Sequence, residues 1–488
     1  MKTRIYLLLS ILLINIAAQA QDVRAYLSYN TFYSPKDGPY IETYISVDGR
    51  TVSWTKNTKG SFNAEVEATL IFEQDSIIKN YSKIIIGSGE VKDSADMKKQ
   101  FINIQRFILP NGNYKVKIKL DDMNDTLQAL FSTGEITIDI PEDKASISSI
   151  EAVQEVRNSS EANKFSHSGY NLIPNIYNFF PSEDSSFIFY AEIYNLNKSI
   201  PEGETYLLNY YITNFETGNI LGKYKAVERR KAKDIDVVLS KFNIVDLPSG
   251  NFNFKLEVID KNNKIIVANS YFIQRENRNI KLKTEDVESI NIINTFAEVI
   301  TGKDTLIDVI RAMRPISTSM ENDFAQTLIK KGNIHIMQQY IYQFWFQRNP
   351  SEPSKPFIAY MVQVMKVNKE FGTSIKKGYD TDRGYVYLKY GEPNNINKQY
   401  NEPASYPYEI WHYYGVRGQN NVRFVFYEPE LVTNDFQLLH SNAIGEVNDY
   451  QWRLHLRKRD QGYRSIDQTG ESTDEWGTHY DDYYNQPR

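Results

Sequence analysis

The chain has 488 residues, no cysteine and a formal net charge of −5 at pH 7. The absence of thiols excludes disulfides, thiolate metal sites and cysteine nucleophiles. The mild acidity argues against nucleic acid or anionic lipid as the main partner. Tyrosine is abundant, with 35 residues against 8 methionines. Because its ring is apolar and its tip polar, it suits half-exposed β-sheets or aromatic binding faces.

The first twenty residues have the pattern of a secretory signal. Lys2 and Arg4 precede an apolar run from Ile5 to Ala18, and small residues at Ala18 and Ala20 suit a cleavage site. We therefore expect residues 1–20 to be removed and the mature chain to start at Gln21. No cysteine follows the apolar run, and no later run reaches the ~18 apolar residues of a membrane helix. The sequence predicts neither a lipid anchor nor a transmembrane span.

Residues 21–142 are predicted to form a first β-sandwich, because short alternating strands over 41–47, 65–72, 101–109, 114–120 and 135–140 are separated by Gly, Asn and Asp turns. Residues 165–280 repeat this unit, since LPNGNYKVKI at 109–118 aligns with LPSGNFNFKL at 247–256. This pattern is typical of immunoglobulin-like sandwiches. We predict two in tandem, joined by a linker over 143–164 that is rich in Ser, Glu and Asn.

The hydrophobic period becomes helical over residues 284–372. Thr284 is placed to cap a first helix, and Thr318 with Glu321 resembles a capping box. Gly372 is the expected C-cap of a last helix. This helical segment leads directly into the next module.

The C-terminal module is predicted over residues 373–465. It opens on a turn-rich segment, after which the Tyr- and Val-rich run 385–390 predicts a strand ended by Gly391 and Pro393. Residues 408–414 and 421–427 predict a hairpin, and 452–456 a further strand. Residues 466–488 are polar and acidic, so we expect a disordered tail there.

The segment 378–393, GYDTDRGYVYLKYGEP, resembles the GWxTD domain, a family of envelope proteins of Gram-negative bacteria. Tyr379 stands where the family has Trp, which keeps an aromatic ring but drops the indole N–H. Further matches follow in the family's order at 344–350, 408–411, 424–426 and 438–441, within Ile334 to Arg459. The resemblance implies a cell-envelope location but supplies no catalytic residues. The fold class we predict is a multidomain, β-rich protein that ends in an α+β GWxTD-like module.

Candidate binding residues concentrate in this module because it combines the motif with acids and aromatic side chains. The candidates are Tyr379, Asp380, Thr381, Asp382, Arg383, Tyr387, Tyr390, Glu409, Trp411 and His440.

His440 and Ser441, with Asp382 or Asp435, have the residue types of a hydrolytic site. Adjacent Ser and His side chains do not usually align as nucleophile and base, however, and no Gly-x-Ser-x-Gly elbow exists. None of the six histidines has the HExxH or His-x-His spacing of a metal site. The sequence therefore predicts no catalytic residue, no metal site and no cofactor.

A basic cluster, including Arg453, Arg457 and Arg459, precedes the acidic tail. It is interpreted as a solvated edge strand that its charges keep from pairing. The alternative is a surface on which the tail folds back, or on which an acidic polymer or partner binds.

The leading functional hypothesis is a non-catalytic interaction module in an envelope protein complex, in the periplasm and possibly at the outer membrane. Association with the membrane would then be peripheral, through a partner. One rival is an envelope glycan-active hydrolase using acids such as Asp382 and Glu409. Another is a carbohydrate-binding protein using the tyrosines, since aromatic faces stack on sugars.

Overall fold

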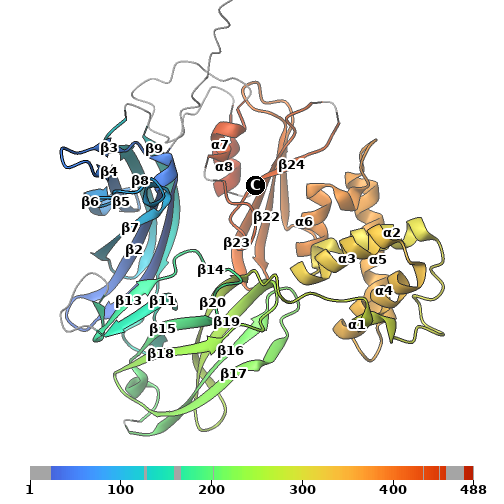
Figure 1. The fold of residues 1–488 in the computed structure, drawn as a ribbon, viewed down its shortest axis with the longest axis horizontal. Helices are drawn as coiled ribbons and strands as arrows, with labels where there is room; N and C mark the ends of the chain where they lie inside the picture. Colours follow the sequence, from blue (N-terminus) through green and yellow to red (C-terminus); the bar gives the residue numbers. More distant parts are fainter. Residues whose placement is uncertain are drawn as a thin grey trace, which may run out of the picture. The chain divides into compact units, whose positions relative to one another are not determined.

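The computed structural model describes residues 23–125, 129–158, 166–201, 203–431, 433–449, 451–457 and 478–486. The predicted secretory signal lies outside these residues. Strands dominate up to Arg275, helices follow, and the last part combines both (Figure 1). The chain divides into two compact units. Unit 1 holds described residues 23–27, 44–103 and 115–134, and unit 2 holds 28–43, 104–114 and those from 135 onward.

Unit 1 is built on a four-stranded sheet in the order β6-β5-β8-β9. Alternate residues of β5 are buried, namely Val66, Ala68, Leu70 and Phe72, so one face of this strand covers a core. The strands predicted at 65–72, 101–109 and 114–120 are confirmed. The bounds are β1 Ala25–Ser34, β2 Gly38–Asp48, β3 Thr55–Lys56, β4 Phe62–Asn63, β5 Glu65–Gln74, β6 Ile77–Gly87, β7 Gln100–Ile108, β8 Gly112–Asp122 and β9 Leu130–Ile138. β1, β2 and β7 form a separate sheet, and β1, β2, β7, β8 and β9 each have residues in both units.

The strand-rich part of unit 2 has two sheets. One has the order β10-β15-β11-β13-β12 with β18 beside β15, and the other has the order β14-β20-β19-β16-β17. Aromatic rings fill the core between them: Phe189 of β15 lies 4.4 Å from Phe254 of β19, measured between ring centroids. The bounds are β10 Ser146–Ile147, β11 Glu151–Asn158, β12 Ser166–His167, β13 Tyr170–Pro174, β14 Phe179–Phe180, β15 Ser186–Tyr194, β16 Thr205–Asn214, β17 Ile220–Lys231, β18 Ile235–Asn243, β19 Gly250–Ile259 and β20 Ile265–Arg275.

The linker predicted over 143–164 is wrong as far as residue 158. β10 and β11 both pair with β15, and Ile147, Ile150 and Ala152 belong to its core. The polar composition misled the prediction because two of its serines, Ser148 and Ser149, accept hydrogen bonds from backbone N–H groups of strands. The hydroxyl of Ser148, for example, accepts a hydrogen bond from the Glu192 N–H at 2.9 Å. Residues 159–165 lie outside the described part of the chain.

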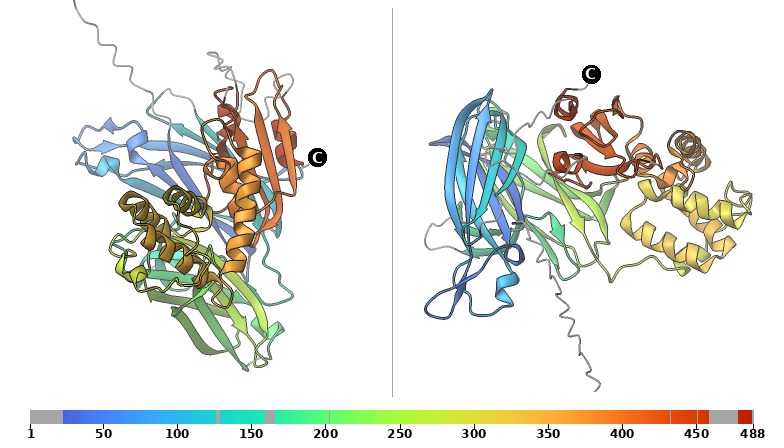
Figure 2. Two further views of the ribbon diagram at one scale, coloured as in Figure 1. Left: turned by 90° about the vertical axis from the view of Figure 1, so that its right-hand side faces the viewer. Right: turned by 90° about the horizontal axis from the view of Figure 1, so that it is seen from above.

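The helices predicted in the later part of this segment are confirmed, but the first one is wrong beyond Glu288, because residues 289–302 form turns and irregular chain. Figure 2 shows the helices gathered in one bundle coloured yellow to orange. Their bounds are α1 Glu285–Glu288, α2 Lys303–Ala312, α3 Ser319–Lys331, α4 Ile334–Arg348 and α5 Ser354–Phe371. Thr318 and Glu321 form the expected capping box of α3, and Gly372 follows the end of α5. Thr284 occupies the cap position of α1, but its side chain makes no capping hydrogen bond. No helix among the described residues is long and apolar enough to cross a membrane.

The C-terminal module has one sheet, β21-β22-β23-β24, with helices on both faces (Figure 1). β22 and β23 are the predicted hairpin. The alternation of β22 directs Glu409, Trp411 and Tyr413 toward α6, and Tyr408 and Ile410 toward α7 and α8. The bounds are α6 Asp382–Tyr390, β21 Asn395–Gln399, β22 Tyr408–Val416, β23 Gln419–Tyr427, β24 Gln437–Ser441, α7 Trp452–His455 and α8 Tyr480–Asn485.

Three predictions in this module are wrong. The run 385–390 belongs to helix α6, because Thr381 caps it and residues at helical spacing are buried, which overrides the strand preference of Tyr and Val. Residues 452–455 form α7 instead of a strand. The tail is not disordered at 478–486, because Tyr480 is buried with Trp452. Residues 458–477 and 487–488 lie outside the description.

Candidate functional site

The motif brings three backbone segments into direct contact, and its glycines are required for that approach. A Cβ on Gly378 would lie 2.1 Å from the carbonyl oxygen of Val367 in α5. A Cβ on Gly384 would lie 1.9 Å from the carbonyl oxygen of Gly378. Any side chain at either position would therefore separate α5, the turn Gly378–Asp380 and α6.

The polar residues of the motif bind the same segments together. The Thr381 hydroxyl donates to the carbonyl of Gly378 at 2.7 Å and accepts from the N–H of Gly384 at 3.1 Å. Asp382 accepts from the N–H of Leu438 at 2.8 Å and so joins α6 to β24. Asp380 is exposed. The side chains of Thr381 and Asp382 thus make their hydrogen bonds to other parts of the same module.

Tyr379 supplies a hydrogen-bond donor although it lacks the indole of the family's Trp. Its hydroxyl donates to Asp308 Oδ1 of α2 at 2.8 Å, and its N–H donates to Asn368 of α5 at 3.1 Å. Burial raises the pKa of Tyr379, and its bond to Asp308 adds to that effect. Burial alone would raise the pKa of Asp308, but the Lys377 ammonium and the tyrosine hydroxyl outweigh it and lower that pKa.

Arg383 and Glu409 form an ion pair in the interior of the module, 5% and 1% exposed. Arg383 Nη1 donates to Glu409 Oε1 at 2.9 Å. Glu409 also accepts from the Tyr400 hydroxyl at 2.7 Å and from the Trp411 indole at 2.8 Å. The guanidinium stands 4.3 Å from the centroid of Phe436. A carboxylate held by three donors in a packed interior is suited to support the fold.

Eight of the ten candidate binding residues are buried. The Tyr387 hydroxyl donates to Glu392 at 3.2 Å and the Tyr390 hydroxyl to Glu446 at 2.8 Å. These positions therefore offer no aromatic groove, because the rings of Tyr387 and Tyr390 fill the core between α6 and the sheet. The eight buried residues are Tyr379, Thr381, Arg383, Tyr387, Tyr390, Glu409, Trp411 and His440.

An open hollow of about 640 Å³ lies beside the motif. It is lined by α2, by α5, by residues 372–377 and by Tyr379. Asp308 is the acidic residue among its lining residues, and it is already paired with Lys377. Ile375, on the same rim, is 79% exposed. The hollow thus offers apolar side chains, and its two lysines are paired, Lys377 with Asp308 and Lys376 with Asp435.

His440 lies on the opposite face of the sheet. Its ring stacks on Trp452 and its Nε2 lies 3.0 Å from the Tyr484 hydroxyl of α8. Burial, reinforced by Arg453, lowers the pKa of His440 to about 4. The neighbouring Ser441 hydroxyl donates to the carbonyl of Arg423 at 2.7 Å. The Ser–His hydrolytic arrangement considered from the sequence is not formed.

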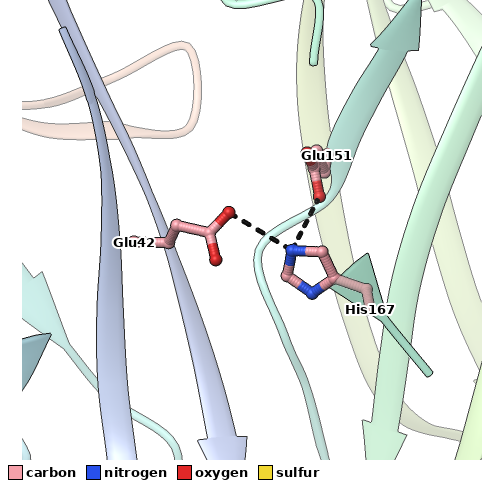
Figure 3. Close-up of side chains that lie close together, drawn as sticks. All are labelled: Glu42, Glu151 and His167. Carbon is pink, nitrogen blue, oxygen red and sulfur yellow. Dashed lines mark hydrogen bonds and ion pairs between the residues drawn. The ribbon is translucent and has the colours of Figure 1, made fainter. Parts of the chain in front are cut away.

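A second charged cluster lies in the strand-rich part of unit 2, where Glu42 of β2, Glu151 of β11 and His167 of β12 point toward one another (Figure 3). His167 Nε2 is 3.2 Å from Glu42 Oε1 and 4.0 Å from Glu151 Oε2. One ligand atom from each lies within 4.8 Å of the others, so these three residues could hold a metal ion. Arg106 also donates to Glu42.

The cations and carboxylates of this cluster perturb one another. Burial opposes ionisation of Glu42, but His167 and Arg106 outweigh it and lower the pKa of that carboxyl. Burial likewise opposes protonation of His167, but Glu42 and Glu151 outweigh it and raise its pKa. The cluster is thus balanced by its own cations. Spacing rules missed it because its members come from three strands, and Glu42 and His167 are 125 positions apart in the sequence.

Residues 269–453 match the GWxTD domain model, a span that starts in β20 and so before Ile334. No curated protein matches the chain. Fibronectin(III)-like modules of CbhA from Clostridium thermocellum align at 8% identity over 50% of this chain and 89% of theirs, with a TM-score of 0.15. β-Glucuronidase 2 of Bacteroides uniformis aligns at 8% identity over 52% of this chain and 32% of its own, with a TM-score of 0.18. Neither score supports an argument about fold.

Proposed function

Because the chain contains a GWxTD domain, we propose that it is an exported, non-catalytic interaction protein of the cell envelope, periplasmic and bound to outer-membrane partners. Its strand-rich parts are immunoglobulin-like spacers in this proposal. One observation carries it: the polar motif residues are engaged inside the module, while the hollow beside them is open. The motif then builds a docking surface instead of a reaction centre.

The arrangement of the acids supports a non-catalytic role. A general acid or base must reach a proton on the substrate. Glu409 is 1% exposed and bound by three donors, and Asp382 accepts a backbone N–H. The rival hypothesis of a glycan hydrolase uses acids of this module such as these two. Turnover of peptidoglycan by purified protein, abolished by Asp382→Asn or Glu409→Gln without unfolding, would replace the proposal.

The proposed docking surface extends from the hollow along the outer face of α5. Ile358, Val362 and Met365 are 59%, 49% and 63% exposed and recur at the 4–3 spacing of helix–helix seams. Lys355 and Lys369 continue the same stripe at its two ends, and both are exposed. No ion pair is recorded for either lysine among the described residues. The partner that fits is an amphipathic helix of an envelope protein, with acidic residues at both ends of its apolar stripe.

Capture from solubilised envelope membranes tests this proposal. Immobilised wild-type protein should retain a partner that Ile358→Glu and Met365→Glu lose, because a buried unpaired carboxylate opposes docking. Val227→Glu is the matched control, since Val227 is 53% exposed on β17 in the strand-rich part. Retention should also fall with salt when the flanking lysines contribute. Equal capture by all four proteins would reject the α5 surface.

A further inference from the structure

The C-terminal segment 478–486 lies on the face of the module's sheet that is opposite α6. Tyr480 of α8 is 3% exposed and packs in one cluster with Tyr408 of β22, Val425 of β23 and Trp452 of α7. The ring centroids of Trp452 and Tyr480 are 5.9 Å apart. The segment thus covers an apolar floor that the sheet and α7 provide together.

Polar groups of the floor bind α8 at both ends. Glu402 Oε1 accepts from the N–H of His479 at 3.2 Å, just before the helix begins. At its other end, His412 Nε2 lies 2.8 Å from the carbonyl oxygen of Tyr483. Burial lowers the pKa of His412, so its neutral ring donates to that carbonyl. These contacts fix the register of the segment through its backbone.

The side chains of the segment also contact the module, through acidic and aromatic residues. Arg453 forms an ion pair with Asp481. The Tyr484 ring lies 5.1 Å from Trp452 between centroids and 4.8 Å from the Arg423 guanidinium, while its hydroxyl meets His440. The fold-back of the acidic tail onto the basic cluster, one of the two interpretations of the sequence, is thus seen at Arg453. The side chains of the segment that make these contacts are thus Asp481 and the tyrosines on either side of it, Tyr480 and Tyr484.

The segment has the properties of a replaceable ligand. α8 has six residues, and helices this short are unstable in water without tertiary contacts. The helical form of α8 therefore depends on its contacts with the sheet and α7. The entropy lost when the segment becomes ordered lowers its affinity for this face. Twenty residues, 458–477, separate it from Arg457 in the sequence. Because it belongs to the same chain, the segment competes with a free segment at a high effective concentration.

We propose that this face is a recognition site for short aromatic–acidic segments, occupied in the resting chain by residues 478–486 and offered to such a segment on a partner when they leave. This inference rests on the proposed interaction function and names a second class of segment that it binds. The α5 stripe takes an amphipathic helix, whereas this face takes a short segment in which an aspartate has tyrosines on both sides.

A cleavable full-length chain tests the proposal. A protease site placed within residues 458–477 leaves the protein intact until it is cut. A fluorescent peptide with the sequence of residues 478–486 should bind the cut protein on the order of 100-fold more tightly than the uncut protein, because cutting removes the tethered competitor. Fluorescence anisotropy measures both affinities, and thermal unfolding confirms that the cut protein stays folded.

Charge exchange identifies the surface. Arg453→Asp should weaken binding of the wild-type peptide roughly tenfold, and a peptide carrying Asp481→Arg should restore it. Arg278→Asp, which alters an exposed arginine of the strand-rich part, should change nothing. A peptide that binds cut and uncut protein equally, fails to bind folded cut protein, or ignores Arg453 overturns the proposal. These outcomes are independent of capture through α5, so the two proposals fail separately.

Discussion

Two buried charge clusters differ in the kind of cation that balances their carboxylates. In the C-terminal module, Glu409 is paired with Arg383, whose guanidinium stays protonated at any pH at which proteins fold. In the strand-rich part of unit 2, Glu42 is paired with Arg106 and also with His167, which can lose its proton near neutral pH. The two glutamates are equally buried, each 1% exposed. The first should therefore hold its part of the fold at constant strength, while the second should respond to pH.

The largest effect is expected from breaking the permanent pair. Arg383→Met leaves Glu409 buried without its cation and should lower the free energy of unfolding by about 3–5 kcal/mol. Denaturant unfolding measures the loss. The double variant Arg383→Met/Glu409→Leu should recover most of it, since two apolar side chains need no partner. Lys366→Met, which breaks the exposed pair with Glu392, should leave stability unchanged. Equal losses in the single and double variants would contradict this interpretation of the pair.

The second-largest effect is expected at Gly384, which follows Arg383 in α6 and contacts the backbone of Gly378. Gly384→Ala brings a Cβ to 1.9 Å from a backbone oxygen, so α6 must shift and the unfolding free energy should fall by about 1–3 kcal/mol. Gly222→Ala on β17 is the control, because its Cβ would meet no atom within 4 Å. Thermal unfolding compares the two. A loss no larger than that of the control would mean that α6 tolerates displacement.

The histidine cluster should make stability depend on pH. Because the folded pKa of His167 is raised, its stabilising effect is complete below the ordinary histidine value of about 6.5 and is lost as pH rises through the folded pKa. The folded pKa of Glu42 is lowered, so its effect is present above the ordinary glutamate value and is lost on acidification. Unfolding free energies from pH 5 to 9 should fall more steeply in the wild type than in His167→Gln. Parallel profiles would show that the imidazole does not titrate as inferred.

An element of this protein can be predicted from the sequence when the contacts that determine it lie between residues close together in the chain. The capping box of Thr318 and Glu321 and the hairpin at 408–427 are set by neighbouring residues, and the structure has both. The run 385–390 was mistaken for a strand because its helix depends on Thr381 and on packing against distant elements. The cluster of Glu42, Glu151 and His167 unites three strands, so no local spacing reveals it. The motif could be located from sequence, but the burial of its side chains could not.

The smallest effect concerns the departure of this chain from the family's Trp. Tyr379→Phe removes the hydroxyl that donates to Asp308 at 2.8 Å while keeping the ring, and should cost about 1 kcal/mol. Tyr379→Trp restores the family's ring, and its indole N–H can serve Asp308 only if α2 moves to admit the larger side chain. That variant should therefore lose stability comparably, because Asp308 keeps its ion pair with Lys377 but loses the hydroxyl donor. Tyr414→Phe, at a side chain 54% exposed, provides the baseline in thermal unfolding. If Tyr379→Phe unfolds at the same temperature as this baseline, the hydroxyl adds nothing, and the ring alone explains why an aromatic residue stands at this position.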